Sequence, residues 1–368
     1  MGGTIALYIS SLRKGGAERV ISNLASYLDE KGYRVVLVTT HRAETEYTVS
    51  DGVIRIISEP DEDALNKGRV GNFGMRFKKL RNIWKEEKPD VILSFIGKNN
   101  MMAILTSLGL GIPVAVSVRG EPTEEYYSKS LRLVAKHLFK LAAGVILQTK
   151  RSMEFFPEAI RKKAVILKNP VNPTFFRERY EGEREKTIVA VGRIDENKNH
   201  KLLIEAFSMM AKDYPDYKLV IYGEGDKKEE LKELVTELGL ERQIFLPGST
   251  DNVVDAIYKT RVFVLPSNTE GMPNTLLEAM ALGLTVIATD CPCGGPAELI
   301  DHQKNGLLTP VKDTAKMKEN LQRILNDLQE ADSMGVNAKI TCEIYRPENV
   351  YQEWEKYLIL LGLGRKGR

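Results

Sequence analysis

Two glutamates and two basic residues in the second half of the chain stand where they could act on one substrate. Glu270 lies in a polar turn after a short apolar strand, and Glu278 lies in the helix that follows. Arg193 and Lys198 come just after another predicted strand. Two cations at one strand end are costly unless they face solvent or an anion, and a diphosphate would use both.

The turn between the two glutamates adds a further group that suits an anion. Gly271, Met272, Pro273, Asn274 and Thr275 open the helix, and the free backbone N–H groups of a helix start can bind phosphate. Glu278, one turn further on, could accept both hydroxyls of a ribose. Either glutamate alone is explained as well by the helix dipole, and the pair could also be an acid/base couple. All four residues together favour a nucleoside-diphosphate site.

The elements around these residues alternate between strand and helix. Seven strands are predicted in the first half: Ile5–Ser10, Tyr33–Thr39, Val53–Ile57, Asp90–Phe95, Pro113–Val118, Gly144–Thr149 and Ala164–Leu167. The second half repeats the pattern with Thr187–Val191, Lys218–Tyr222, Gln243–Leu246, a strand from Val262, and Thr285–Thr289. This alternation predicts an α/β fold with parallel sheets covered by helices on both sides.

The chain of 368 residues is too long for one ordinary core. We expect a Rossmann-like domain over 1–172, a polar linker over 173–186, a second Rossmann-like domain over 187–344 and a terminal helix within 345–368. Ligands of such sheets bind beyond the carboxyl ends of the strands. Two such edges facing each other would form an interdomain cleft.

Composition excludes several classes of protein. The net charge of +3 implies no nucleic-acid partner. Three cysteines do not indicate a disulfide framework and suit a reducing cytoplasm. No apolar run approaches the length that spans a bilayer, and the N-terminus is predicted to be a fold element rather than a signal peptide. The acidic triplet 61–63 could hold a metal, but a solvated loop is the preferred interpretation.

A basic helix is predicted over Phe73–Glu87, with aromatic and aliphatic residues at helical spacing on one face. It could be an ordinary surface helix. The local excess of positive charge favours contact with anionic lipid headgroups or a lipid-linked pyrophosphate. The residues predicted to make this contact are Arg76, Lys78, Lys79, Arg81 and Lys85.

Several of these motifs resemble one family. The chain is similar to the family 4 retaining glycosyltransferases of GT-B fold, and in particular to bacterial members that extend lipid-linked oligosaccharides. The resemblance rests on residues 15–19 (GGAER), Val191-Gly192-Arg193 with Lys198, Gly223-Glu224-Gly225, Glu270-Gly271-Met272-Pro273 with Glu278-Ala279, and Pro292–Glu298.

The resemblance implies a role for each motif. Arg193 and Lys198 would bind the donor diphosphate and stabilise the leaving group, Glu278 would hold the ribose, and Glu270 would contact the donor sugar. The catalytic set would be Glu270, Arg193 and Lys198. The further donor contacts would be Gly16, Gly223, Gly225, Asp251, Asn252, Val253 and the residues 271–275 named above. The reaction would retain anomeric configuration and would need no metal or other cofactor.

The first domain departs from the family at one position. Many members carry a histidine after the strand that ends near Val118, and this chain has Arg119. Arginine cannot act as a general base, although it can remain a fixed cation near a sugar or phosphate. We expect Glu18, Arg119 and Glu121 to contact the sugar or the acceptor.

The sequence therefore predicts a hexosyltransferase that is cytoplasmic and peripheral on the inner face of the cell membrane. It would move an N-acetylhexosamine or hexose from a UDP-sugar to a polyprenyl-pyrophosphate-linked saccharide during surface-glycan or glycoprotein assembly. There are three alternatives: a family 4 enzyme with a non-lipid acceptor, a dinucleotide-dependent oxidoreductase, and a non-enzymatic nucleotide-sugar binder, which the intact set of Arg193, Lys198, Glu270 and Glu278 disfavours. The oxidoreductase is disfavoured because neither half carries G-x-G-x-x-G followed by an acidic residue.

Overall fold

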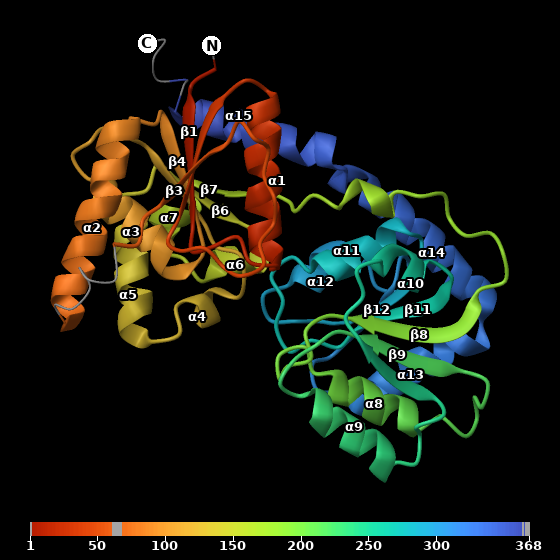
Figure 1. Cartoon of the computed structure of the whole chain (residues 1–368). Helices are drawn as coiled ribbons and strands as arrows, with labels where there is room; N and C mark the ends of the chain where they lie inside the picture. Colours follow the sequence, from red (N-terminus) through yellow and green to blue (C-terminus); the bar gives the residue numbers. More distant parts are fainter. Residues whose placement is uncertain (1, 61–67, 363, 365–368) are drawn as a thin grey trace. The chain divides into compact units, whose positions relative to one another are not determined.

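The computed structural model describes residues 2–60, 68–362 and 364, with the side chain of Arg69 left aside. The chain forms two compact units. Unit 1 comprises 1–169 and 348–368, and unit 2 comprises 170–347. Each unit is built around its own parallel sheet, as the strand–helix alternation predicts (Figure 1).

Unit 1 contains a seven-stranded sheet in the order β3-β2-β1-β4-β5-β6-β7. Its strands are β1 (Thr4–Ile9), β2 (Arg34–Thr39), β3 (Ile54–Ile57), β4 (Val91–Phe95), β5 (Val114–Ser117), β6 (Gly144–Leu147) and β7 (Ala164–Ile166). All neighbouring pairs are parallel. The strand order reverses direction between β1 and β4, which makes this pair the switch point where such sheets bind ligands.

Helices cover both faces of this sheet (Figure 1). They are α1 (Gly16–Glu30), α2 (Gly68–Glu87), α3 (Gly97–Ser107), α4 (Pro122–Glu125), α5 (Lys129–Leu138), α6 (Lys150–Glu154), α7 (Glu158–Arg161) and α15 (Pro347–Gly362). The buried residues of α1 and α15 pack on one face. Those of α2, α3 and α5 pack on the other. The unit is therefore a three-layer sandwich.

The last helix of the chain belongs to unit 1. The indole ring of Trp354 on α15 packs 5.7 Å from the ring of Phe95, measured between centroids, and its Nε1 donates to the carbonyl of Lys168 at 3.0 Å. The hydroxyls of Tyr27 and Tyr33 both donate to Glu355 at 2.9 Å. These contacts fix α15 against α1, the end of β4 and the residue that precedes β2.

Unit 2 contains a six-stranded parallel sheet in the order β10-β9-β8-β11-β12-β13. Its strands are β8 (Glu185–Val191), β9 (Lys218–Tyr222), β10 (Ile244–Gly248), β11 (Thr260–Leu265), β12 (Thr285–Thr289) and β13 (Leu307–Thr309). The strand order reverses between β8 and β11, so this pair is the switch point of unit 2. The sequence pattern did not indicate the three-residue strand β13.

The helical elements of unit 2 are η2 (Pro173–Phe175), α8 (His200–Ser208), α9 (Lys228–Glu237), α10 (Val253–Tyr258), α11 (Asn274–Ala281), α12 (Gly295–Leu299), α13 (Thr314–Asn326), α14 (Leu328–Cys342) and η3 (Glu343–Tyr345). No helix in the described part of the chain combines the length and the apolar character that a membrane-spanning segment requires.

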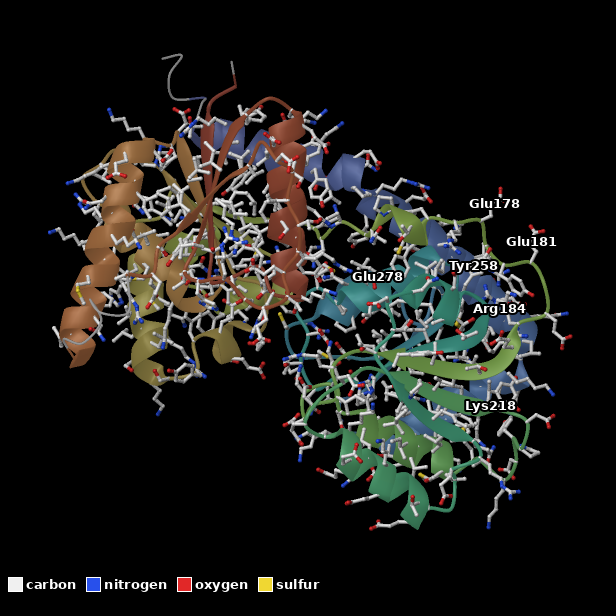
Figure 2. The ribbon with its side chains drawn as sticks, in the orientation of Figure 1. Glu178, Glu181, Arg184, Lys218, Tyr258 and Glu278 are labelled. Carbon is white, nitrogen blue, oxygen red and sulfur yellow. The ribbon has the colours of Figure 1, made fainter. Side chains whose placement is uncertain are left out.

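The polar segment 173–186 was expected to be a linker, but it contains a buried arginine. Arg184 is only 4% exposed, and its guanidinium donates to the carbonyls of Tyr258, Thr260 and Gly283 at 3.0–3.2 Å (Figure 2). Burial lowers the pKa of Arg184 to about 10. The end of this segment is therefore anchored to unit 2 and runs directly into β8.

Candidate functional site

The strongest candidate site lies at the switch point of unit 2. The ammonium of Lys198, which follows β8, lies 2.5 Å from Oε1 of Glu270, which follows β11. The two side chains are 17% and 12% exposed. The hydroxyl of Ser267 donates to the same carboxylate oxygen at 2.7 Å. Two of the predicted catalytic residues are thus brought together, although they are far apart in the sequence.

The loops that carry these residues are joined by hydrogen bonds of the Asn197 side chain and of the backbone. Oδ1 of Asn197 accepts hydrogen bonds from the backbone N–H and the hydroxyl of Thr269 at 3.0 and 2.8 Å, and its amide donates to the carbonyl of Thr269. The backbone N–H of Asn268 donates to the carbonyl of Asn197 at 2.7 Å. These hydrogen bonds between the two loops hold Lys198 beside Glu270.

Arg193 stands at the edge of the same site. Its side chain is 75% exposed, and its Nη2 lies 3.1 Å from Oδ2 of Asp195. The other oxygen of Asp195 accepts the backbone N–H of Lys198 at 2.9 Å. Asp195 therefore holds both basic residues. Arg193 keeps most of its guanidinium open to solvent and to an incoming anion.

The helix α11 begins beside Glu270. Met272 and Pro273 are buried, Pro273 is the N-cap, and Asn274 and Thr275 form the first helical positions at intermediate exposure. The first N–H groups of a helix have no intrahelical partner. Glu278 lies on α11 and is 4% exposed (Figure 2). Glu270, the start of α11 and Glu278 thus follow one another along the chain, and their contacts with sugar, phosphate and ribose stay predictions.

Close packing against neighbouring backbone requires glycine at two turns of this site. A Cβ added at Gly225 would lie 2.1 Å from the carbonyl oxygen of Ile194, and one added at Gly295 would lie 1.5 Å from that of Gly271. The N–H of Ile194 also donates to the carbonyl of Glu224 at 2.9 Å. The segment 223–225 therefore supports the Arg193 loop, and contact with a base stays a prediction.

The predicted contacts at 251–253 begin helix α10. The side-chain oxygen of Asn252 caps this helix by accepting the N–H of Asp255 at 3.2 Å. Asp251 and Asn252 are exposed, and Val253 is half-buried as the first helical residue. This capping role accounts for an asparagine at position 252 without any bound ligand. Its part in base binding stays a prediction.

The predicted contacts in unit 1 start with the glycine turn before α1. Gly16 is the exposed first residue of that helix, and Glu18 is a buried acidic residue in its first turn. The carboxylate of Glu18 lies 3.6 Å from the guanidinium of Arg13. A carboxylate in this position also favours the helix start through the helix dipole.

Arg119 lies inside unit 1 at the end of β5. Its guanidinium stacks 4.8 Å from the ring centroid of Phe95 and 5.6 Å from that of Trp354, and it donates to the side chain of Asn169. Burial lowers the pKa of Arg119 to about 9, so it remains a cation at neutral pH. Its contacts within the described residues are structural, and its predicted contact with sugar or acceptor stays untested.

A carboxylate that sequence reasoning missed joins the loops after β4 and β5. Glu125 accepts the backbone N–H groups of Gly97, Arg119 and Gly120 at 3.0, 2.5 and 2.9 Å. The neighbouring Glu121 caps the short helix α4 by accepting from Thr123. No local pattern could have distinguished Glu125 from exposed glutamates, because its partners follow two different strands.

The five predicted lipid-contacting cations of α2 do not share one face. Arg76 pairs with Glu59 at 2.5 Å, and Lys79 donates to the carbonyl of the same residue. Arg81 donates to the carbonyls of Thr106 and Leu108, which binds α2 to the end of α3. The two remaining members, Lys78 and Lys85, are exposed.

The part of the chain that the structure describes contains no group of three or more His, Cys, Asp or Glu residues that could hold a metal ion. The acidic triplet 61–63, considered above as a metal site, lies outside the described residues.

A buried histidine beside the basic loop was also missed. His200, the first residue of α8, is 3% exposed. Burial and the nearby ammonium of Lys198 lower the pKa of His200 to about 4. It is therefore neutral at physiological pH and adds no charge beside Lys198.

Comparison with known proteins agrees with the fold and the motifs. Residues 14–175 match the family model "Glycosyltransferase Family 4", and residues 171–341 match "Glycosyl transferases group 1". Together the two models span most of the chain, which belongs to this family of glycosyltransferases. The predicted resemblance is confirmed.

Two relatives come from Campylobacter jejuni. One is GalNAc-alpha-(1->4)-GalNAc-alpha-(1->3)-diNAcBac-PP-undecaprenol alpha-1,4-N-acetyl-D-galactosaminyltransferase, 27% identical over 96% of this chain and 98% of its own length. The other is N-acetylgalactosamine-N,N'-diacetylbacillosaminyl-diphospho-undecaprenol 4-alpha-N-acetylgalactosaminyltransferase, 29% identical over 96% of this chain and 99% of its own.

Solved structures show the same architecture. The crystal structure of Anabaena HepE in complex with UDP matches with a TM-score of 0.80 at 18% identity, covering 97% of this chain and 99% of that one. Two parallel-sheet Rossmann-like units of this kind constitute the GT-B fold, as the sequence predicts.

Proposed function

We propose that this glycosyltransferase moves an N-acetylhexosamine or hexose from a UDP-sugar to a saccharide carried on a polyprenyl pyrophosphate. The reaction retains anomeric configuration and uses no metal. The enzyme works in the cytoplasm at the inner face of the cell membrane, in the assembly of a surface glycan or glycoprotein.

One observation carries the donor half of this proposal, namely the Lys198–Glu270 ion pair at the switch point of unit 2. A lysine ammonium has three donors, and Glu270 uses one of them. The other donors and the open guanidinium of Arg193 are available to a diphosphate. These fixed cations would stabilise the charge that develops on the leaving nucleoside diphosphate. The UDP seen with HepE supports the choice of base.

The acceptor half of the proposal is supported by the relatives. Both Campylobacter jejuni proteins are named for acceptors linked through a diphosphate to undecaprenol. Both align along nearly the whole chain, including unit 1, which has its own switch point.

A donor panel tests the proposal. Release of UDP or GDP is measured from a set of nucleotide sugars, with and without a polyprenyl-diphosphate-linked saccharide. We expect one UDP-sugar to be consumed rapidly only when the lipid-linked saccharide is present. Equal consumption with a water-soluble saccharide would contradict the lipid-linked acceptor. NMR of the product gives the anomeric configuration, and a chelator tests the expected independence from metal.

Membrane association has its own test. The exposed residues Lys78 and Lys85 are the α2 cations best placed to meet anionic headgroups. Co-sedimentation with vesicles that contain anionic lipid should decrease in the Lys78→Glu/Lys85→Glu variant. Equal sedimentation of the variant and the wild type would show that α2 does not provide the contact.

A further inference from the structure

A cavity of about 820 Å³ opens in unit 1 at the carboxyl ends of β1, β2 and β3. Its walls come from α2, α3 and α5. This volume is within the range of ligand pockets, which is roughly 300–1,000 Å³. All of its lining residues belong to unit 1, whereas Lys198 and Glu270 belong to unit 2.

The part of the cavity between the helices is apolar. Its lining includes Phe73, Leu80, Met102, Leu105, Leu131 and Leu138. Methionine side chains adapt to irregular apolar shapes. A branched hydrocarbon chain would therefore fit this part of the cavity, whereas a sugar would find few hydrogen-bond partners there.

The end of the cavity beside the strands is polar and basic. Arg76 lines it and is paired with Glu59, whose carbonyl also accepts the ammonium of Lys79. Lys98, at the start of α3, is exposed and makes no ion pair within the described residues, although its ammonium lies 6.0 Å from the ring centroid of Tyr127. His41 is also part of the lining. Two cations of the lining, Arg76 and Lys98, thus stand against one carboxylate, that of Glu59, so this end suits an anion.

The apolar lining continues to the surface. Phe73 on α2 is 51% exposed and Val134 on α5 is 47% exposed, although both line the cavity. A chain that enters between α2 and α5 would therefore cover side chains that are now in contact with water. A long chain could also continue beyond the protein surface into a bilayer.

We propose that this cavity binds the isoprenoid chain of the acceptor next to its diphosphate, with the diphosphate at the end formed by Lys98 and Arg76. The assignment rests on the proposed function, because it assumes a polyprenyl-diphosphate acceptor. It adds that unit 1 recognises the lipid itself, and not only the saccharide that the lipid carries.

The test compares one saccharide diphosphate on two carriers, a long polyprenyl chain and a methyl group. We expect wild-type kcat/KM to be at least about tenfold higher for the polyprenyl carrier, since burial of several hydrocarbon groups easily exceeds the free energy of a tenfold preference. Val134→Trp and Leu105→Trp narrow the cavity and should reduce this preference to near unity.

Leu133→Trp is the matched control. Leu133 neighbours Val134 on α5 and is 60% exposed, but it does not line the cavity. This variant should keep the wild-type preference. If wild type shows no preference, or if both cavity variants keep it, the inference is overturned while the proposed function stands.

A binding measurement separates the inference from the activity. Farnesyl diphosphate that carries a photoreactive diazirine is cross-linked to the wild type, and the labelled peptides are mapped. Labelling within 97–107 and 129–138, reduced by Leu105→Trp, supports the inference. Labelling confined to other segments overturns it. A wild type that transfers sugar to neither carrier refutes the proposed function, and the labelling still decides the inference.

Discussion

The two switch points have the same topology and different chemistry. Between β8 and β11 of unit 2, Lys198 and Glu270 form an ion pair with little exposure. Between β1 and β4 of unit 1, the side chain of Asn99 donates to Ser10 at 2.9 Å, and an apolar cavity opens beside them. The two sheets thus carry different side chains at corresponding edges, which suits the two different ligands proposed for them.

The helices that follow the two switch points begin in a related way. Asn199, before α8, has φ of +48°, and Ile96, before α3, has φ of +71°. Asparagine adopts positive φ with little cost, whereas a β-branched residue does so rarely. Backbone strain of this kind gathers at functional sites. The strained start of α3 therefore agrees with a ligand edge in unit 1.

Among these predictions, the largest effect is expected on kcat when the ammonium of Lys198 at the unit 2 switch point is removed. We expect Lys198→Ala to lower kcat by a factor on the order of 10²–10³, as loss of one preorganised charge-stabilising group does. Steady-state release of the nucleoside diphosphate measures this change. Lys201→Ala, which changes an exposed lysine at the second position of α8, should behave as wild type. Similar losses in both variants would refute a specific role for Lys198.

In unit 1 the corresponding prediction is that substitution of Glu125 lowers the free energy of unfolding. Glu125→Ala leaves the N–H groups of Gly97, Arg119 and Gly120 without their acceptor. An unsatisfied buried group costs about 1–3 kcal/mol, and solvent can reach some of these groups, so we expect a total loss of about 3 kcal/mol. Urea unfolding measures it, with the exposed Glu86→Ala as the control. An unchanged midpoint would show that Glu125 does not hold these loops.

The buried histidine of unit 2 predicts a pH dependence. Because the pKa of His200 is lowered to about 4 from an ordinary 6.5, the unfolded chain binds its proton first as pH falls. Stability from this group is therefore full above pH 6.5 and is lost between pH 6.5 and 4, by about 3 kcal/mol. Unfolding of wild type and His200→Leu across this range should show the difference. Parallel curves would contradict it.

The smallest of these effects concerns the proposed contact between Glu278 and the ribose of the donor. Glu278→Gln should raise KM for the donor about tenfold, because it weakens a charged hydrogen bond to bound ligand. The value of kcat at saturating donor should change little. A loss of kcat with unchanged donor affinity would assign Glu278 to the chemical step instead.

The sequence predicted the architecture well because parallel strands buried on both faces are continuous apolar runs. All strands except β13 were expected within a few residues of their bounds. β13 has three residues and gains its identity only by pairing with β12.

The candidate site was predictable as a set of residues but not as a set of contacts. Lys198 and Glu270 were expected at one ligand, yet their direct ion pair depends on adjacent strands, which sequence spacing does not give. The same limit applies to Arg119 and Arg184. The sequence placed Arg184 in a polar linker and Arg119 at the sugar or acceptor, and it did not indicate the backbone carbonyls around Arg184 or the aromatic rings beside Arg119.

Calorimetric titration with UDP and uridine, and with GDP and guanosine, tests the central claim that Arg193 and Lys198 hold the donor diphosphate. The account predicts that UDP binds on the order of 100-fold more tightly than uridine. It also predicts that this gap shrinks to tenfold or less in Lys198→Ala. Equal affinity for diphosphate and nucleoside in both pairs, or a gap that Lys198→Ala leaves unchanged, would contradict it.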